Sequence, residues 1–188
     1  MIKILGISGS LRRKSYNTAL LHTALTLLDE GVELEIVTLH GIPLYDADED
    51  AQGQPQAVKD LKARVMACDG LLMATPEYNN GIPGVFKNAI DWLSRPPAEI
   101  SQVFGNRAVA LIGATPGGFG TISAQTHWLP VLRALGTRPW FGGRLLVSGA
   151  HKVFNDNGEL VDEAVRKQLR DFLRGYSQFI QANSDSLA

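Results

Sequence analysis

The sequence lacks the features on which several classes of protein depend. One cysteine among 188 residues excludes a disulfide framework, a four-cysteine zinc site and a cysteine-ligated iron–sulfur cluster. The 18 Lys and Arg residues nearly balance the 19 Asp and Glu residues, so the chain has no overall positive field for nucleic acid or an anionic membrane. It has no apolar run that approaches a membrane span and no secretory signal pattern. We therefore expect a cytoplasmic protein that binds neither nucleic acid nor membranes.

The residues that are present indicate one folded domain. A chain of 188 residues with 45% hydrophobic content buries a full core, so residues 1–188 are expected to form a single domain. The lone cysteine, Cys68, lies in the apolar run VMACDGLLMA. We expect a small buried side chain there rather than a reactive thiol.

The sequence offers no metal site. The acidic segment YDADEDAQG, residues 45–53, spaces its aspartates like a calcium loop, but Ala51 and Ala57 stand where that loop needs Gly and Glu. We expect a solvated acidic loop there. The four histidines are scattered without an i, i+4 pair. Of these, His127 is expected to pack partly buried beside Trp128.

Apolar runs alternate with helical patterns along the chain. Strands are expected at 2–8, 34–39, 70–75, 108–114 and 144–147, and helices at 18–28, 54–67, 85–93, 123–135 and 161–180. The residues from Ala182 onward are expected to fray. Strands that are nearly all apolar belong to a parallel sheet with helices on both faces. The pattern predicts an α/β fold with a doubly wound, five-stranded parallel sheet and right-handed crossovers.

Three unusual loops follow the first, third and fourth expected strands. They read GSLRRKSYN (9–17), TPEYNNGIPG (75–84) and ATPGGFG (114–120). Ligands of doubly wound sheets bind beyond the carboxyl ends of the strands, where the strand order reverses. The three loops should therefore surround one binding site.

The first loop does not match the common nucleotide-binding motifs. A P-loop needs glycine at the positions that Ser8 and Arg13 occupy. The dinucleotide fingerprint fails as well, because Gly6 is followed two residues on by Ser8 and not by glycine. A cradle for a diphosphate or a triphosphate is therefore not indicated.

The first loop does carry donors for a single phosphate. Ser10, Ser15 and Asn17 offer neutral donors, Arg12 offers a charge-assisted bond, and the following helix presents its free N–H groups. The alternative interpretation is a well-capped helix, with Ser15 as N-cap and the cations solvated. The second and third loops decide between the two.

The other two loops are suited to a flat ligand with polar edges. The second loop combines prolines and glycines with Tyr78, an aromatic ring, and several amides. The third loop leaves amides exposed, because its glycines cannot cover them. Either loop alone could be an ordinary turn. Their shared position at one edge of the sheet favours a ligand site.

Together the segments GSLRRKSYN and PEYNNGIPGVFKNAIDWLSRP resemble the NAD(P)H-dependent FMN reductase family. This flavodoxin-like group includes quinone, azo-dye and chromate reductases, and the resemblance runs from about Ile4 to Ile180. It implies a flavodoxin-like fold with strand order 2-1-3-4-5, noncovalent FMN, and NADPH or NADH as co-substrate. It also implies a homodimer or homotetramer whose other partners are small-molecule electron acceptors.

The resemblance also assigns residues to parts of FMN. It places Ser10, Arg12, Ser15 and Asn17 at the phosphate, Pro76, Glu77, Tyr78 and Asn79 at the isoalloxazine ring and ribityl chain, and Thr115, Gly117 and Gly118 at the pyrimidine end. It implies no catalytic side chain. Hydride would pass from NAD(P)H to flavin N5 and then, in a ping-pong cycle, two electrons would pass to a quinone, a flavin, an azo compound or chromate.

Two other functions share this fold and cofactor. One is a flavodoxin-type electron carrier, against which the near-neutral charge and the basic first loop argue, since such carriers are usually strongly acidic. The other is a non-enzymatic flavin-binding sensor module, which the sequence leaves open.

Overall fold

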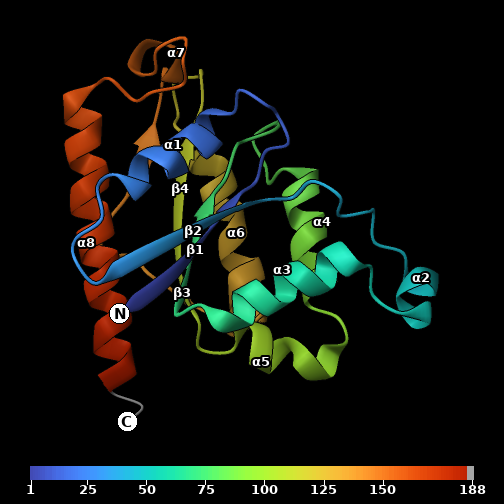
Figure 1. Ribbon diagram of the computed structural model, residues 1–188. Helices are drawn as coiled ribbons and strands as arrows, with labels where there is room; N and C mark the ends of the chain where they lie inside the picture. Colours follow the sequence, from blue (N-terminus) through green and yellow to red (C-terminus); the bar gives the residue numbers. More distant parts are fainter. Residues whose placement is uncertain (186–188) are drawn as a thin grey trace.

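A parallel sheet flanked by helices forms the body of the protein (Figure 1). The computed structural model describes residues 1–185. Its strands are β1 (Ile2–Ser8), β2 (Val32–Thr38), β3 (Gly70–Ala74), β4 (Ala108–Ala114), β5 (Arg138–Pro139) and β6 (Leu145–Val147). Its helices are α1 (Tyr16–Leu25), α2 (Ala47–Gln52), α3 (Gln56–Ala67), α4 (Gly84–Leu93), α5 (Ile100–Phe104), α6 (Ile122–Ala134), α7 (Ala150–Val153) and α8 (Glu163–Asp185), with a 3-10 turn at Pro97–Glu99.

The strand order is β2-β1-β3-β4, and the position beyond β4 is divided between β5 and β6. This confirms the predicted flavodoxin-like order 2-1-3-4-5. β5 pairs with Ala108 and Val109, whereas β6 pairs with β4 from Ile112 to Ala114. The expected strand at 144–147 is β6. The two-residue β5 carries no apolar run and includes Pro139, a residue that strands admit mainly at their edges, so the sequence did not indicate it.

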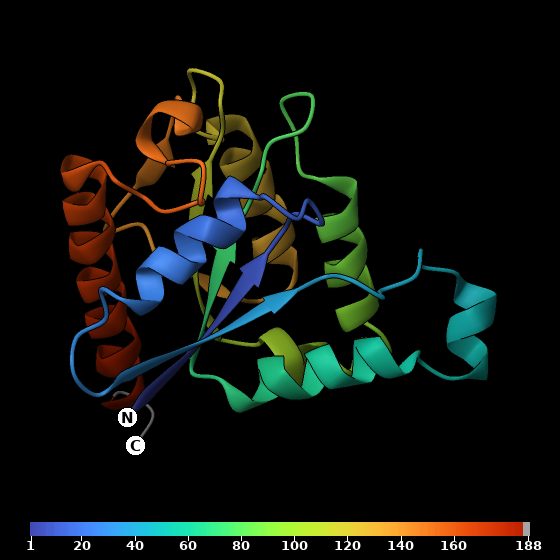
Figure 2. The same cartoon turned by 45° about the horizontal axis from the view of Figure 1, so that its top comes forward.

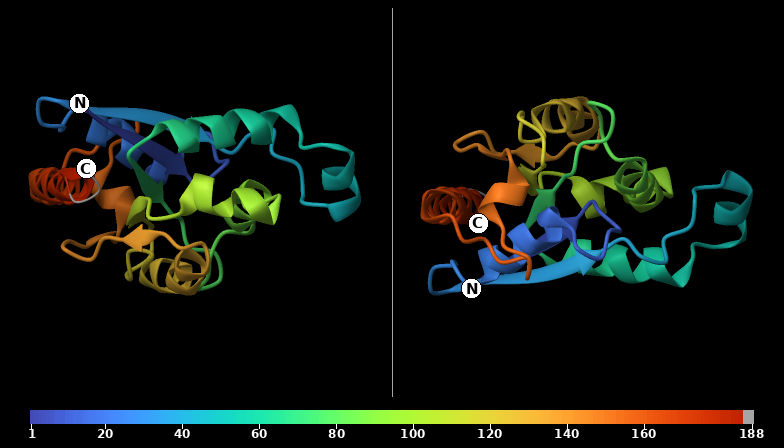
Figure 3. Two further views of the ribbon diagram at one scale, coloured as in Figure 1. Left: turned by 90° about the horizontal axis from the view of Figure 1, so that it is seen from below. Right: turned by 90° about the horizontal axis from the view of Figure 1, so that it is seen from above.

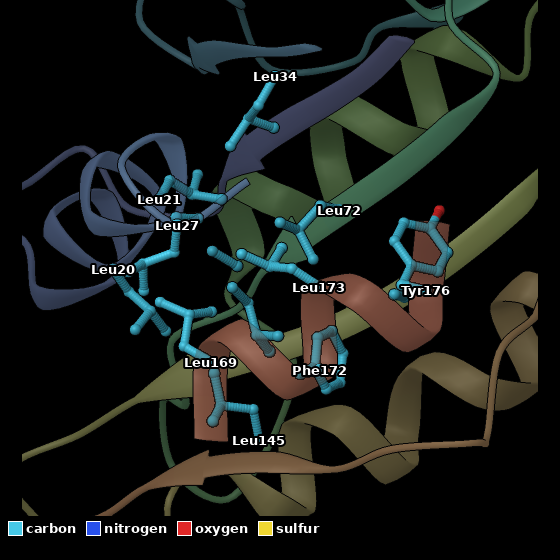
Figure 4. Packing of buried hydrophobic residues seen from close by; sticks show 14 of the residues in the cluster. Leu20, Leu21, Leu27, Leu34, Leu72, Leu145, Leu169, Phe172, Leu173 and Tyr176 are labelled. Atoms are coloured by element: carbon cyan, nitrogen blue, oxygen red, sulfur yellow. The ribbon is translucent and has the colours of Figure 1, made fainter. Parts of the chain in front are cut away.

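Two apolar clusters hold the helices to opposite faces of the sheet. One contains Leu20 and Leu21 of α1 and Leu173 of α8, and Figure 4 shows these side chains meeting over the strands. The other contains side chains of α3, α4, α5 and α6. Successive strand residues alternate between the clusters, as Leu71 and Leu72 do. Seen along the sheet, α1 and α8 lie on one side and α3 and α6 on the other (Figure 3).

Several helices begin or end at other residues than expected, and three short helices were not expected at all. α1 begins two residues earlier than predicted, directly after its N-cap Ser15. α8 continues through Ala182, where fraying was expected, to Asp185, and the expectation for 186–188 lies outside the described residues. α2, α5 and α7 were not predicted, because four to six residues are too few to show a helical period.

The acidic segment after β2 is a helix and not the loop that we expected. Asp46 caps α2, its Oδ1 accepting from the N–H of Asp48 at 2.8 Å, and α2 buries no side chain. Figures 2 and 3 show α2 standing away from the body. Its base is tied to α4 through Asn88, which accepts from the N–H of Tyr45 and donates to the carbonyl of Pro43.

Candidate functional site

The three unusual loops leave the sheet at one level. Ser8 pairs in register with Ala74, and Ala74 with Ile112, so β1, β3 and β4 end side by side. The N–H of Gly9 donates to the carbonyl of Ala74 at 2.9 Å, and the N–H of Thr75 donates to that of Ile112 at 2.9 Å. The loops therefore leave the same edge of the sheet, at the top of Figure 1, as the sequence predicts.

An aromatic stack lies beneath these loops. Phe86 of α4 and Trp128 of α6 are fully buried and meet edge to face, with ring centres 4.9 Å apart. Trp128 Nε1 donates to Thr75 Oγ1 at 3.1 Å, which fastens the second loop to α6. A Cβ at residue 9 would lie 2.2 Å from Phe86 Cδ1, so only glycine lets the first loop approach the ring. The stack gives the loops a rigid floor.

The first loop keeps two hydroxyl hydrogens for a ligand. Ser15 Oγ accepts from the N–H of Thr18 at 3.3 Å, and Ser10 Oγ accepts from the N–H of Arg12 at 3.2 Å. Because each oxygen accepts in these bonds, each hydroxyl can still donate its hydrogen. The first N–H groups of α1 point to the same region and carry the positive end of the helix dipole. The predicted N-cap role of Ser15 is confirmed, and it leaves the hydroxyl hydrogen of Ser15 available to an anion.

Asn17 holds two of the loops together. Its Nδ2 donates to the carbonyl of Ala114 at 3.0 Å and its Oδ1 accepts from the N–H of Ala114 at 2.9 Å, in a buried position. These two hydrogen bonds tie α1 to the point where the third loop leaves β4. Only the second Nδ2 hydrogen remains for a ligand, so its contribution to a phosphate site stays a prediction. What the structure gives Asn17 is a positioning role.

The three cations of the first loop are exposed to solvent. The guanidinium carbon of Arg12 lies 5.9 Å from the ring centre of Tyr16, in a cation–π contact. Arg12 follows Ser10 closely, but its side chain has to turn away from Tyr16 to reach an anion at the start of α1. Its long flexible chain allows that change.

The second loop ends in a tight hairpin. Tyr78 and Gly81 exchange backbone hydrogen bonds of 3.2 and 3.0 Å. Between them Asn79 and Asn80 both have positive φ, 50° and 57°, as a primed two-residue turn requires. The Tyr78 side chain is 47% exposed beside this turn. Adjacent asparagines before glycine are a hairpin signal that identifies this turn, whereas Asn79 was expected only as a ligand contact.

Glu77 is engaged within the protein. Its Oε2 accepts from the N–H of Ala124 at 3.0 Å, in the first turn of α6. The N-cap residue of α6, Thr121, has a φ of 67° and makes no side-chain cap, so Glu77 supplies an anionic cap from another loop. A contact of Glu77 with a ligand stays a prediction. The cap joins residues 47 positions apart in the chain, and no local pattern indicates it.

Backbone hydrogen bonds to Val147 and Gly149, at and after the end of β6, fix the course of the third loop. The N–H of Thr115 donates to the carbonyl of Val147, and the N–H of Gly149 donates to the carbonyl of Gly117. Thr115 Oγ1 accepts from the N–H of Gly117 at 3.3 Å. A Cβ at Gly118 would meet no atom within 4 Å, so this backbone faces open space. The loop presents its main chain, as the sequence predicts.

His127 and Trp128 have different surroundings. Trp128 is part of the floor, whereas His127 is exposed, which corrects the expectation of a partly buried histidine. The helix turns the neighbouring side chain outward, and Nδ1 of His127 lies 3.9 Å from where a Cβ on Gly81 would be. His127 therefore borders the hairpin of the second loop.

These residues fit FMN. Hydroxyl donors and a helix N-terminus suit one phosphate, an exposed aromatic ring and a glycine backbone suit a flat ring system, and the two lie at one edge of the sheet. Within residues 1–185 no three His, Cys, Asp or Glu side chains are grouped so that they could hold a metal ion.

A family model described as NADPH-dependent FMN reductase matches residues 2–152. The chain belongs to this family. It is 42% identical over 180 residues to the NAD(P)H-dependent FMN reductase of Pseudomonas aeruginosa, with 96% of each chain covered. It is 35% identical over 180 residues to the 2-hydroxy-1,4-benzoquinone reductase of a Burkholderia species, with 96% of this chain and 97% of the relative covered.

A solved structure gives the same result. The flavoenzyme NAD(P)H:(acceptor) oxidoreductase FerB of Paracoccus denitrificans superimposes with a TM-score of 0.86 at 29% identity, over 97% of this chain and 98% of FerB. The predicted family, fold and cofactor class are confirmed. The protein is an NAD(P)H-dependent, FMN-containing oxidoreductase, which decides against an electron carrier and a non-enzymatic module. Among the described residues, no helix is long and apolar enough to cross a membrane.

Proposed function

We propose that the protein reduces quinones with NAD(P)H, using FMN held noncovalently where its three loops meet. The observation that carries this proposal is that two hydroxyls with free hydrogens, on Ser10 and Ser15, and the exposed ring of Tyr78 lie on loops above the rigid floor of Phe86 and Trp128. The quinone reductase named among the relatives, at 35% identity, supports the choice of acceptor. Free flavin is a second acceptor of the same open site.

The first loop is proposed to hold the FMN phosphate. The hydroxyls of Ser10 and Ser15 and the first N–H groups of α1 are its neutral donors. Arg12 supplies the charge-assisted bond after turning from Tyr16. Asn17 holds this cradle against the end of β4.

The other two loops are proposed to hold the ring system. Pro76, Tyr78 and Asn79 would line the isoalloxazine ring and ribityl chain, with Glu77 fixing their loop to α6. Thr115, Gly117 and Gly118 would meet the pyrimidine end with main-chain groups. Bound there, FMN accepts hydride from NAD(P)H and passes two electrons to the acceptor.

The chain's own contribution is binding and orientation. Backbone amides of the second and third loops would donate to the ring system and so stabilise the negative charge that forms on its reduction. No side chain is required as a general acid or base. We further propose a homodimer or homotetramer in the cytoplasm, where the buried free thiol of Cys68 would stay reduced.

Steady-state kinetics test this function. Apoprotein loaded with FMN should oxidise more than one equivalent of NAD(P)H per flavin under anaerobic conditions only when a quinone is present. Plots of reciprocal rate at several quinone concentrations should be parallel, since the two substrates use one face in turn. Intersecting lines would contradict the shared site. Failure to consume NAD(P)H with any quinone would overturn the proposed acceptor.

A further inference from the structure

A long hollow runs along the outer face of α1, outside the three-loop site. A cavity of about 700 Å³ lies between α1 and residues 154–159, the segment that leads to α8, and the first loop closes one end. A second hollow of about 600 Å³ adjoins it and shares Ala19 and His22. Figure 2 shows α1 and this segment side by side. We call the larger cavity the α1 groove.

One end of the α1 groove is strongly basic. Arg12, Arg13 and Lys14 all line it. In the part of the chain that the structure describes, none of the three forms an ion pair. The whole chain has a formal net charge of −1, so this concentration of cations is local. An anion entering the groove at this end would meet three cations that are not paired with a carboxylate of residues 1–185, while Asp156 and Glu159 line the groove elsewhere.

The floor of the α1 groove is aromatic. Tyr16 and Phe154 line it with ring centres 5.4 Å apart, and Phe154 is only 5% exposed. Because Phe154 is buried, the partly exposed ring of Tyr16 is the one available to the flat face of a base.

The far end of the α1 groove offers hydrogen-bond acceptors on a fixed turn. Asn155 Oδ1 accepts from the N–H of Asn157 at 3.0 Å and from that of Glu159 at 2.9 Å, which sets the turn's shape. The exposed Asp156 and Asn157 side chains stand at its tip and line the groove. Carboxylate and amide oxygens there can accept from the exocyclic amine of a purine.

We propose that the α1 groove binds the adenosine 2′-phosphate half of NADPH and makes the enzyme prefer NADPH to NADH. Arg13 and Lys14 bind the 2′-phosphate, which is the only group that distinguishes the two nucleotides. The adenine lies over Tyr16 with its amine toward Asp156. Ser15 belongs both to the FMN cradle and to the wall of the groove, so the two sites adjoin. This inference rests on the proposed function.

Binding of nucleotide fragments tests the groove without turnover. Calorimetric titration of the FMN-loaded protein with adenosine 2′,5′-bisphosphate should show binding about tenfold or more tighter than with 5′-AMP, since charge-assisted bonds are strong. The double variant Arg13→Ala/Lys14→Ala should lose that advantage. Lys59→Ala, which removes an exposed cation of α3, is the matched control and should keep it. The same double variant should lower the NADPH-to-NADH ratio of kcat/KM by a similar factor.

Each other outcome is decisive. Equal binding of the two fragments, or a bisphosphate affinity that the double variant leaves unchanged, would overturn the assignment. If NADH reduces the flavin but adenosine 2′,5′-bisphosphate does not bind, the proposed function stands and the assignment of the α1 groove as a nucleotide site is wrong. Binding of the bisphosphate by a protein that oxidises neither NADPH nor NADH would support the assignment of the α1 groove and overturn the proposed function.

Discussion

Asn17 shows how one side chain can set the geometry of a site without facing the ligand. The Nδ2 and the Oδ1 of its side-chain amide both bind the backbone of Ala114, so the start of α1 and the third loop are held together. Replacing Asn17 by Ala leaves a buried N–H and a buried carbonyl without partners. We expect the free energy of unfolding to fall by about 2–4 kcal/mol, measured by urea denaturation. Gln178→Ala, an exposed amide on α8, is the control and should change it little. A similar small loss for Asn17→Ala would contradict the positioning role.

Arg12 and Arg13 are neighbours with different proposed partners. Arg12→Ala removes the charge-assisted bond to the FMN phosphate, and we expect FMN affinity to fall about tenfold. Arg13→Ala should weaken FMN binding much less, because Arg13 is assigned to the α1 groove. Quenching of flavin fluorescence on titration measures both constants. Equal or reversed effects would remove the assignment of Arg12.

Single residues also show where sequence reasoning stops. The donors of the first loop could be predicted, because they sit together between a strand and a helix. The partners of Asn17 and Glu77 could not, since they lie 97 and 47 positions away. Such contacts are visible only after the sheet has brought β1, β3 and β4 into register.

At the scale of elements, α6 depends on a cap from the second loop. Because the Thr121 side chain caps no backbone N–H of α6, the carboxylate of Glu77 is the anionic partner at this helix end. We expect Glu77→Ala to lower the free energy of unfolding by about 1 kcal/mol, and Glu77→Gln to restore part of it, because an amide oxygen still accepts. Thermal melts of the three proteins measure this. Equal stability of all three would contradict the cap.

α8 is fixed to the sheet by Tyr176, labelled in Figure 4. Its hydroxyl lies 2.8 Å from the carbonyl oxygen of Leu71 and 2.9 Å from that of Ala108, and burial raises the pKa of Tyr176 well above its usual value. The unfolded tyrosine ionises near pH 10. Because the native pKa is higher, stability is fully present below about pH 10 and is lost as pH rises further.

Tyr176→Phe tests this anchor. It should cost about 1–2 kcal/mol at neutral pH, because two buried carbonyls lose their donor. It should also reduce the loss of stability above about pH 10. Denaturation curves at neutral and alkaline pH give both numbers. An unchanged alkaline loss would assign that loss to other groups, among them Cys68, whose pKa burial also raises.

Elements differ in how well their sequence predicts them. β1 and β4 have the expected limits, because continuous apolar runs bounded by loops leave no other choice. β5, α2 and α7 were not predicted, since they are short and are defined by what they contact. None of them carries a proposed FMN contact, and the strands that position the site are among those whose patterns are strongest.

At the scale of the whole molecule, a nearly neutral chain concentrates three cations in its first loop, and we propose that they bind anions there. The net charge of −1 excludes a general affinity for polyanions, and the cations of the first loop lie beside both the FMN cradle and the α1 groove. The parallel topology brings the three loops together, because the carboxyl ends of all its strands lie at one edge of the sheet.

We propose that this edge of the sheet holds an FMN that NAD(P)H reduces and a quinone reoxidises. Anaerobic addition of NADPH, and separately of NADH, to the FMN-loaded protein should bleach the visible flavin absorption, and a stoichiometric quinone should restore it. A flavin spectrum that neither nucleotide changes, or one that the quinone fails to restore after bleaching, would contradict the account.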